Sequence, residues 1–152
     1  MAKLENIFKK SLLRIMGTRW DVQSHEDRFA LGIPDLSYGL LGAGGWIELK
    51  QIPEWPPRPE TKGKPSKYTS EQVNWLRKRG KKAGFCFVLV RVGQGRSAEH
   101  FLFSWKSARA VRAGLTREEY GKEALLSWKG AIVASELEDA LATFSCLPSI
   151  CP

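Results

Sequence analysis

Cysteine, histidine and long hydrophobic runs are scarce in this sequence, and each shortage excludes a class of protein. Its 152 residues include three cysteines and two histidines. No two cysteines have the C-x-x-C spacing of a zinc site, and His25 and His100 lie far apart. The longest apolar run, residues 85–90, is far shorter than the roughly 20 residues that a membrane-spanning helix needs. The composition therefore argues against a zinc protein and against a transmembrane protein.

The N-terminal residues also lack the continuous apolar core of a secretory signal peptide. Cys146 and Cys151 could pair in principle, but reduced thiols fit a protein that is not secreted. We therefore expect a cytoplasmic protein with no membrane partner. Residues 93–95 lack the third glycine and the following helix of a dinucleotide fingerprint. They indicate a hairpin turn, and no small-molecule cofactor is expected.

Positive charge is present in excess. The chain carries 24 Lys and Arg against 16 Asp and Glu, which gives a net charge of +8. Residues 50–82 hold ten of the basic and three of the acidic side chains and so account for +7 of that total. This balance favours a polyanionic partner such as nucleic acid, although a single basic cluster can also be no more than a solvated surface.

The first half of the hydrophobic pattern predicts both helix and strand. Apolar residues at helical spacing indicate an amphipathic helix over residues 4–15. Residues 29–41 and 46–50 indicate a β-hairpin or meander, with a turn at residues 42–45. Residues 52–68 are rich in proline and suit neither a helix nor a central strand, so we expect an exposed, mobile basic loop there.

The second half of the pattern predicts a helix, a strand pair and further helices. Thr69 starts a capping box with Gln72, and the helix should end at a glycine, residue 80 or 84. Residues 85–90 indicate a buried central strand, and residues 100–105 a strand that pairs with it. The remainder is predicted to be helical, with capping-box spacing also at Thr116 and Ser135.

Residues of opposite charge lie at the ends of two predicted strands. Glu48 and Lys50 are two positions apart in an extended segment, so their side chains share one face of the strand. The alternate residues of that strand are apolar and point to the opposite, packed face. Pro34 fixes its own φ, which places Asp35 at a defined entry to the neighbouring strand.

These residues carry a family resemblance. Pro34-Asp35, followed after twelve residues by Glu48-Leu49-Lys50, resembles the PD-(D/E)XK nuclease motif. With the flanking glycine and tryptophan pattern and the later Gln72-x-x-Trp75-Leu76, the sequence resembles the VRR-NUC branch and related Holliday-junction-resolvase-like phage nucleases. The resemblance implies an α/β fold with a restriction-endonuclease-like core, a mixed β-sheet flanked by α-helices. It also implies a location in the host cytoplasm if a phage encodes the protein.

We expect a single nuclease domain over residues 1–152. The resemblance covers its core, about residues 1–92. Residues 93–152, predicted to form a strand and helices, carry no assignable motif.

The resemblance implies a role for each motif residue. Asp35, Glu48 and the backbone carbonyl of Leu49 would bind Mg²⁺, with Mn²⁺ as a substitute, because hard oxygen ligands suit these ions. Lys50 would orient or help deprotonate the attacking water, or would stabilise charge on the scissile phosphate. Taken singly, Asp35 could begin a turn, and Glu48 with Lys50 could form a surface pair on a strand.

Two further residues match the family pattern less specifically. Glu5 matches an acidic residue of the first helix that joins the metal site in many family members, but it could instead pair with Lys9 at i+4. Gln72 matches a helix-borne glutamine near the catalytic centre, but it could serve only in the capping box with Thr69.

The predicted hairpin places the two motif carboxylates too far apart to bind one metal ion. A hairpin folded about residues 42–45 sets Glu48 opposite Gly39, with Asp35 about two residue pairs away. A flat ladder would hold these carboxylates too far apart to share an ion. We therefore expect a bulge, a bend or an asymmetric turn, which the nearby glycines would permit.

Together, these features and the resemblance predict a metal-dependent DNA endonuclease that is selective for branched DNA such as a four-way junction, flap or fork. No base-reading module is recognisable, so basic residues of the 58–82 segment would bind phosphates without sequence preference: Arg58, Lys62, Lys64, Lys67, Arg77, Lys78 and Lys81. A homodimer would supply the two sites that symmetric cutting of a junction needs. Trp20, Trp55 and Tyr68 could stack on bases or fold back onto the protein.

Two other functions remain open at this point. A nickase or restriction-type nuclease would act on ordinary duplex DNA with the same residues. A non-catalytic nucleic-acid-binding accessory protein would keep the fold alone, but it would have no use for two carboxylates beside a polyanion.

Overall fold

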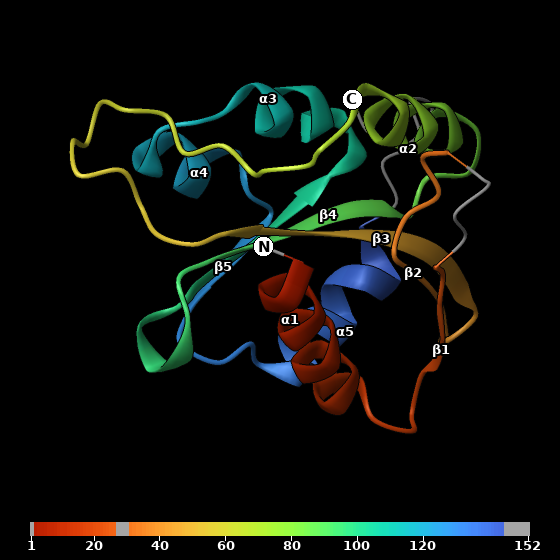
Figure 1. Ribbon diagram of the computed structural model, residues 1–152. Helices are drawn as coiled ribbons and strands as arrows, with labels where there is room; N and C mark the ends of the chain where they lie inside the picture. The colour runs from red at the N-terminus through yellow and green to blue at the C-terminus, as the bar shows by residue number, and fades with distance from the viewer. Residues whose placement is uncertain (1, 27–30, 145–152) are drawn as a thin grey trace.

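A six-stranded mixed sheet organises the chain, with helices on both of its faces (Figure 1). The computed structural model describes residues 2–26 and 31–144. The strands lie in the order of the sequence and are β1 (Asp21–Ser24), β2 (Leu36–Leu40), β3 (Ala43–Ile52), β4 (Cys86–Val92), β5 (Glu99–Ser104) and β6 (Leu126–Lys129). The β3–β4 pair is parallel and the other neighbouring pairs are antiparallel. The predicted α/β class, a mixed sheet flanked by helices, is confirmed.

The helices form two layers that enclose the sheet. They are α1 (Ala2–Met16), α2 (Ser70–Ala83), α3 (Ala108–Ala113), α4 (Arg117–Glu123) and α5 (Ala134–Thr143), with short 3₁₀ turns at Gly95–Ser97 and Trp105–Ser107. α1 and α5 cover one face, and α2, α3 and α4 cover the other (Figure 1). Among the described residues, no helix is long and apolar enough to span a membrane.

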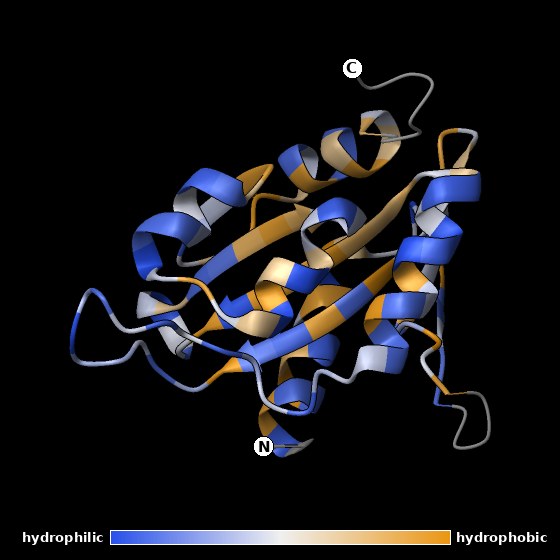
Figure 2. Cartoon of the chain, turned by 90° about the horizontal axis from the view of Figure 1, so that it is seen from above, coloured by the Kyte–Doolittle hydropathy of each residue, from blue (hydrophilic) through white to orange (hydrophobic). Residues whose placement is uncertain are grey.

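Side-chain alternation along β3 assigns its residues to the two layers. Ile47 and Leu49 are fully buried in the core beneath α1 and α5, whereas Glu48 and Lys50 face the α2 layer between them. Figure 2 shows this as alternating hydrophobic and hydrophilic segments along the strand. β3 is a central strand, so both charged side chains are carried into the interior of the protein.

The entry to α2 follows the predicted capping box. The Thr69 hydroxyl accepts a hydrogen bond from the Gln72 N–H, and the Gln72 side chain accepts one from the Thr69 N–H. Gly84 ends the helix with a φ of 64°, in the left-handed region that favours glycine. β4 follows directly and all of its residues are buried. The helix and the buried strand are therefore confirmed as predicted.

The β2–β3 hairpin corrects the predicted register. Its turn is the dipeptide Leu41-Gly42, with φ values of 50° and 81°, rather than residues 42–45. The strands consequently pair Leu36 with Ile47, so the next position along brings Asp35 opposite Glu48. The predicted separation of the two carboxylates is wrong, and no bulge is needed, because a two-residue turn already aligns them.

The segment between α1 and β2 and the C-terminal region also depart from the sequence patterns. β1 and β6 were not predicted, since four-residue strands are too short to show a reliable period. The capping box proposed at Ser135 is wrong: α5 begins after Val133 without a side-chain cap, and its expected partner Glu138 accepts a hydrogen bond from Arg19 instead, at 2.8 Å. Cys146 and Cys151 lie outside the described residues.

The packing of α2 on Trp105 gives a stability prediction. A Cβ added at Gly80 would lie 2.3 Å from the buried Trp105 ring, so Gly80→Ala should overpack this contact and lower the free energy of unfolding by about 1–3 kcal/mol. Gly121→Ala in α4, where a Cβ would meet nothing within 4 Å, should be neutral or stabilising by up to about 1 kcal/mol. Urea unfolding of both variants tests this, and equal stability of the two would contradict the close α2 packing.

Candidate active site

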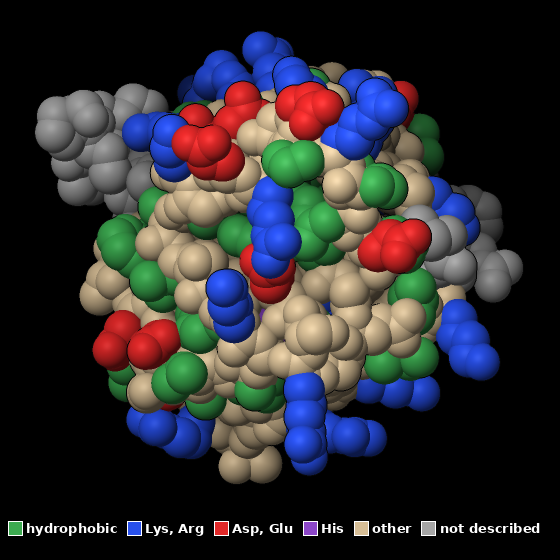
Figure 3. All heavy atoms as spheres, turned by 90° about the vertical axis from the view of Figure 1, so that its left-hand side faces the viewer, with side chains coloured by type: hydrophobic (Ala, Val, Ile, Leu, Met, Phe, Trp, Pro, Cys, Tyr) green, Lys and Arg blue, Asp and Glu red, His purple; other side chains and the backbone are tan. Residues whose placement is uncertain are grey.

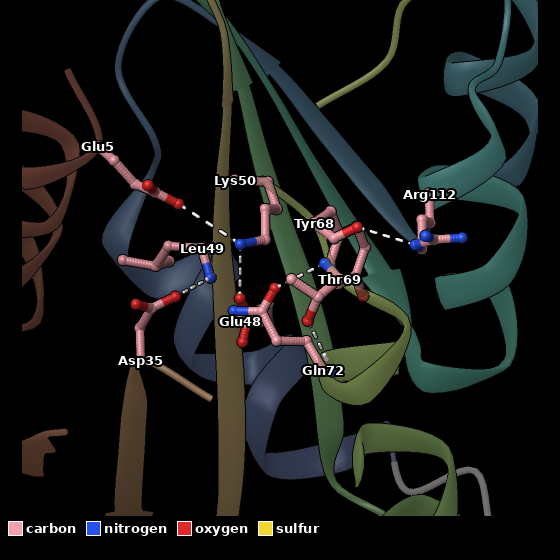
Figure 4. Close-up of polar contacts among 9 residues, drawn as sticks. All are labelled: Glu5, Asp35, Glu48, Leu49, Lys50, Tyr68, Thr69, Gln72 and Arg112. Carbon is pink, nitrogen blue, oxygen red and sulfur yellow. Dashed lines mark hydrogen bonds and ion pairs between the residues drawn. The ribbon is translucent and has the colours of Figure 1, made fainter. Parts of the chain in front are cut away.

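The charged residues of β3 form the centre of the candidate site (Figure 4). Glu48 and Lys50 are 1% and 3% exposed. The Lys50 Nζ lies 2.8 Å from Glu48 Oε1, an ion-pair contact. Neither Glu48 oxygen has a well-directed hydrogen bond within the part of the chain that the structure describes. A buried carboxylate with so little of its hydrogen-bonding capacity used by protein donors needs a further partner, such as an ordered water or an ion.

Asp35 joins these residues because β2 is shorter than β3. β2 begins at Leu36, so β3 continues past Glu48 without a β2 neighbour. The Asp35 carboxylate fills part of this gap, and its Oδ2 accepts a hydrogen bond from the Leu49 N–H at 2.8 Å. The structure therefore brings together Asp35, Glu48, Leu49 and Lys50, the core of the predicted site.

Glu5 reaches the same point from the opposite layer. It lies in the first turn of α1, and its Oε1 is 3.6 Å from Lys50 Nζ. The contact is possible because the edge of β3 is open here, so side chains from both faces can meet around it (Figure 4). The alternative pairing of Glu5 with Lys9 is not observed, since Lys9 contacts Glu26 at 3.3 Å.

The electrostatics of the site reflect three carboxyl groups around one ammonium. Burial, followed by the neighbouring Asp35 charge, raises the pKa of Glu48 to about 8. Burial also raises the pKa of Glu5. For Lys50, burial lowers the pKa, but the surrounding carboxylates outweigh it and the net direction is upward. A further cation would relieve this surplus of negative charge.

The residues fit a small, hard divalent cation. Carboxylate oxygens are the ligands that Mg²⁺ prefers, and this ion needs few protein ligands because it retains several waters. The weakly satisfied Glu48 oxygens supply the observation that supports the fit. Among residues 2–26 and 31–144, the acidic side chains are not preassembled into a three-ligand cluster, and the Lys50 ammonium lies between Glu48 and Glu5.

Gln72 lies at the edge of this group. Its Oε1 accepts a hydrogen bond from the Thr69 N–H at 3.0 Å, so the capping function is observed. Figure 4 shows its side chain extending from α2 toward Glu48. A catalytic role for Gln72 remains a prediction.

Tyr68 contributes to the site in a way that the sequence did not reveal. Its ring lies 5.1 Å from Lys50 Nζ, in a cation–π contact, and it is 6% exposed. Burial and the Glu48 charge raise the pKa of its hydroxyl. Arg112 in α3 donates a hydrogen bond to the Tyr68 carbonyl at 2.8 Å and so fixes this end of the loop. Tyr68 therefore folds back onto the protein and packs against the site.

A buried network anchors α1, and with it Glu5, to the sheet. Arg91 Nε donates to Gln51 Oε1 at 2.6 Å, and Arg91 Nη2 donates to the Leu4 carbonyl at 3.1 Å. The guanidinium also lies 4.9 Å from the centre of the Phe8 ring. The available signal was a lone arginine in an otherwise apolar strand, and the sequence could not show that it bonds to the residue before Glu5.

The predicted DNA-binding residues separate into distinct places. Lys64 and Lys67 line a hollow with Arg112 beside the start of α2, and Lys62 precedes Gly63, which pairs with Leu115. Arg58 lies among the loop prolines, near Arg117. Gly63 and Tyr68 are buried, so the 52–68 segment is not uniformly exposed as predicted, although Figure 2 shows its projecting part as hydrophilic.

The basic residues of α2 have different surroundings. Arg77 lies over the Trp105 ring and donates to the Lys106 carbonyl. Lys78 instead lines a hollow with Trp75, and Lys81 is exposed near the end of the helix. Figure 3 shows charges of both signs on the face toward which the loop projects. The positive charge is therefore divided among several surfaces.

Comparisons with known proteins find matches among the solved structures. No family model matches the sequence, and a search of curated proteins finds no match. One of these structures is that of Hjc, a Holliday junction resolvase from the archaeal hyperthermophile Archaeoglobus fulgidus. It is 15% identical in sequence with a TM-score of 0.46, and the alignment covers 81% of this chain and 99% of that one.

His100, which lies opposite Arg91 in the β4–β5 pair and beside the Phe8 ring, gives a pH prediction. Burial and the neighbouring Arg91 lower the pKa of His100 to about 4, from an ordinary value of 6.5. The folded state therefore favours neutral His100. The resulting contribution to the free energy of unfolding is fully present above pH 6.5 and is lost as the pH falls toward 4.

At pH 4 this loss should be roughly 2–3 kcal/mol. His100→Gln, which cannot gain the proton, should show a correspondingly smaller decline between pH 6.5 and pH 4. Urea unfolding at several pH values measures the difference, which removes the contribution of carboxyl groups common to both proteins. Parallel declines would show that His100 is not held neutral.

Proposed function

We propose that this protein is a metal-dependent nuclease that hydrolyses phosphodiester bonds in DNA. The observation that carries the proposal is the buried Glu48 carboxylate, with little of its hydrogen-bonding capacity used, beside Asp35 and Lys50 at an open strand edge. A structural ion pair would have its remaining oxygens satisfied by protein donors. A pair of carboxylates and an ammonium next to basic loops is instead suited to a phosphate substrate and its metal ion.

Asp35, Glu48, the Leu49 carbonyl and Glu5 would hold Mg²⁺ or Mn²⁺. When bound, this ion would supply a water of lowered pKa and a Lewis acid for a phosphoryl oxygen. The hydrogen bond from the Leu49 N–H orients the Asp35 carboxylate toward this position. Lys50, held by Glu48 and Tyr68, would orient a water or contact the scissile phosphate.

The basic residues around the start of α2 would bind the DNA backbone. Lys64, Lys67 and Arg112 line one hollow beside Thr69, and the Thr69 N–H also lies next to Gln72 at the edge of the site. Phosphate contacts of this kind fix the position of the DNA without reading its sequence. We therefore favour recognition of branched DNA by shape, with a homodimer supplying two sites. Ordinary duplex DNA is the alternative substrate.

Cleavage assays test the catalytic proposal. Wild-type protein with Mg²⁺ should nick an end-labelled four-way junction and leave the matching linear duplex intact, and EDTA should abolish the reaction. Glu48→Gln should reduce the rate by about 10²-fold or more, because it removes a metal ligand. The matched control Glu60→Gln, in the exposed loop, should cut normally. Equal cutting of duplex would favour the nickase or restriction-type function, and binding without cutting would favour an accessory protein.

The salt dependence of binding tests the loop. Replacement of Lys62, Lys64 and Lys67 by alanine should weaken DNA binding and make the slope of log K against log salt shallower by up to about 2.7, or about 0.9 for each lost phosphate contact. Fluorescence anisotropy in EDTA measures this without cleavage. The control triple replaces Lys10, Arg14 and Lys129, exposed residues of α1 and β6, and should change the slope little. A slope equal to that of wild type would exclude the loop from the interface.

A further inference from the structure

Two tryptophans beside the candidate site form a surface that the nuclease proposal leaves unexplained. Trp46 in β3 and Trp75 in α2 meet edge to face, with ring centres 4.9 Å apart. His25 lies on the other side of Trp46 at 5.0 Å and is held by a hydrogen bond to Ser37. All three rings are partly exposed in the part of the chain that the structure describes. We call Trp46, Trp75 and Arg79 the aromatic platform.

The other tryptophans are structural by comparison. Trp20, Trp105 and Trp128 are between 4% and 7% exposed. Trp55 packs on Tyr120 at 5.2 Å and donates its ring N–H to Glu99. Trp46 packs partly against the core beneath α2, but Trp46 and Trp75 both keep exposed ring surface, where they contact each other and Arg79.

Positive charge surrounds the platform. Arg79 places its guanidinium 5.7 Å from the Trp46 ring and 5.0 Å from the Trp75 ring. Trp75, Lys78, Arg79 and Lys82 line a hollow of about 220 Å³ that includes no acidic side chain. Aromatic rings interleaved with cations suit unpaired nucleic acid, whose bases stack on rings or guanidinium planes while its phosphates contact lysines.

The platform is close to the candidate catalytic residues. Trp46 precedes Glu48 by two positions on the same face of β3, a separation of about 7 Å along the strand. Trp75 follows Gln72 by three positions, which is about one turn of α2. A strand whose phosphate lies at Glu48 would therefore bring a neighbouring base within reach of the rings.

We propose that the aromatic platform binds unpaired bases of DNA next to the bond that is cut. This rests on the proposed nuclease function and adds a preference, among branched substrates, for DNA with a single-stranded part such as a fork or flap. Duplex DNA keeps its bases stacked on one another, so it cannot use the rings without being opened. The platform would thus select branched DNA over ordinary duplex.

The test compares bases with abasic positions in the unpaired arm of a labelled fork. Binding is measured in EDTA, by anisotropy, for wild type, Trp75→Ala, Trp75→Phe and the control Phe144→Ala, an exposed aromatic residue on the opposite layer. Wild type should bind the intact fork about tenfold more tightly than the abasic fork. Trp75→Ala should lose this preference, Trp75→Phe should keep most of it, and Phe144→Ala should keep all of it.

Two results would overturn the proposal. One is equal affinity of wild-type protein for the intact and abasic forks, a comparison that does not depend on any variant folding. The other is an unchanged preference in Trp75→Ala, which would place base recognition elsewhere. Because binding is measured without cleavage, the two proposals fail separately. Mg²⁺-dependent cutting with no preference for bases would support the nuclease proposal and exclude the platform proposal. A Trp75-dependent preference for bases without any cutting would support the platform proposal and exclude the nuclease proposal.

Discussion

The buried carboxyl group of Glu48 is the constraint on which the site and its surroundings depend. An unpaired carboxylate in the middle of a sheet costs several kcal/mol, so the fold must place compensating charge beside it. Lys50 provides this from the same strand at 2.8 Å. Asp35 and Glu5 then add two carboxyl groups that a single ammonium cannot balance. A sequence that needed only a stable core would place an apolar residue at this position, and the observed surplus of negative charge is understandable if a cation is part of the functional state.

Two layers of the fold share this one site because the sheet is interrupted beside it. Asp35, Glu48 and Lys50 come from the hairpin, whereas Glu5 comes from a helix packed on the opposite face. Arg91 links them by bonding the backbone of α1 to Gln51, the residue after Lys50. The position of Glu5 therefore depends on interior packing beneath the sheet. On the other face, Tyr68 and the capped start of α2 close around Lys50 and Glu48.

Much of the fold and the centre of the site could be predicted from the sequence, for identifiable physical reasons. Amphipathic spacing in α1, the capping box at Thr69 and the apolar run of β4 are local signals, and all three elements form as expected. The motif residues were found from their spacing. The register of the β2–β3 hairpin was not predicted correctly. A left-handed φ at Leu41 is unusual for a branched residue, and the nearby glycines suggested a later turn. Contacts such as Tyr68 with Lys50, or Trp46 with Trp75, depend on tertiary packing that has no local signature.

The two-residue turn at Leu41-Gly42 has a consequence for how this chain can vary in length. Twelve residues separate Asp35 from Glu48: five in each paired stretch and two in the turn. One residue inserted into either stretch would move the two carboxylates out of register by one and place them on opposite faces of the sheet, unless a bulge absorbed it. A matched insertion in both stretches would preserve the pairing. Length changes in this hairpin should therefore be tolerated in pairs, and the spacing of the motif is itself part of the site.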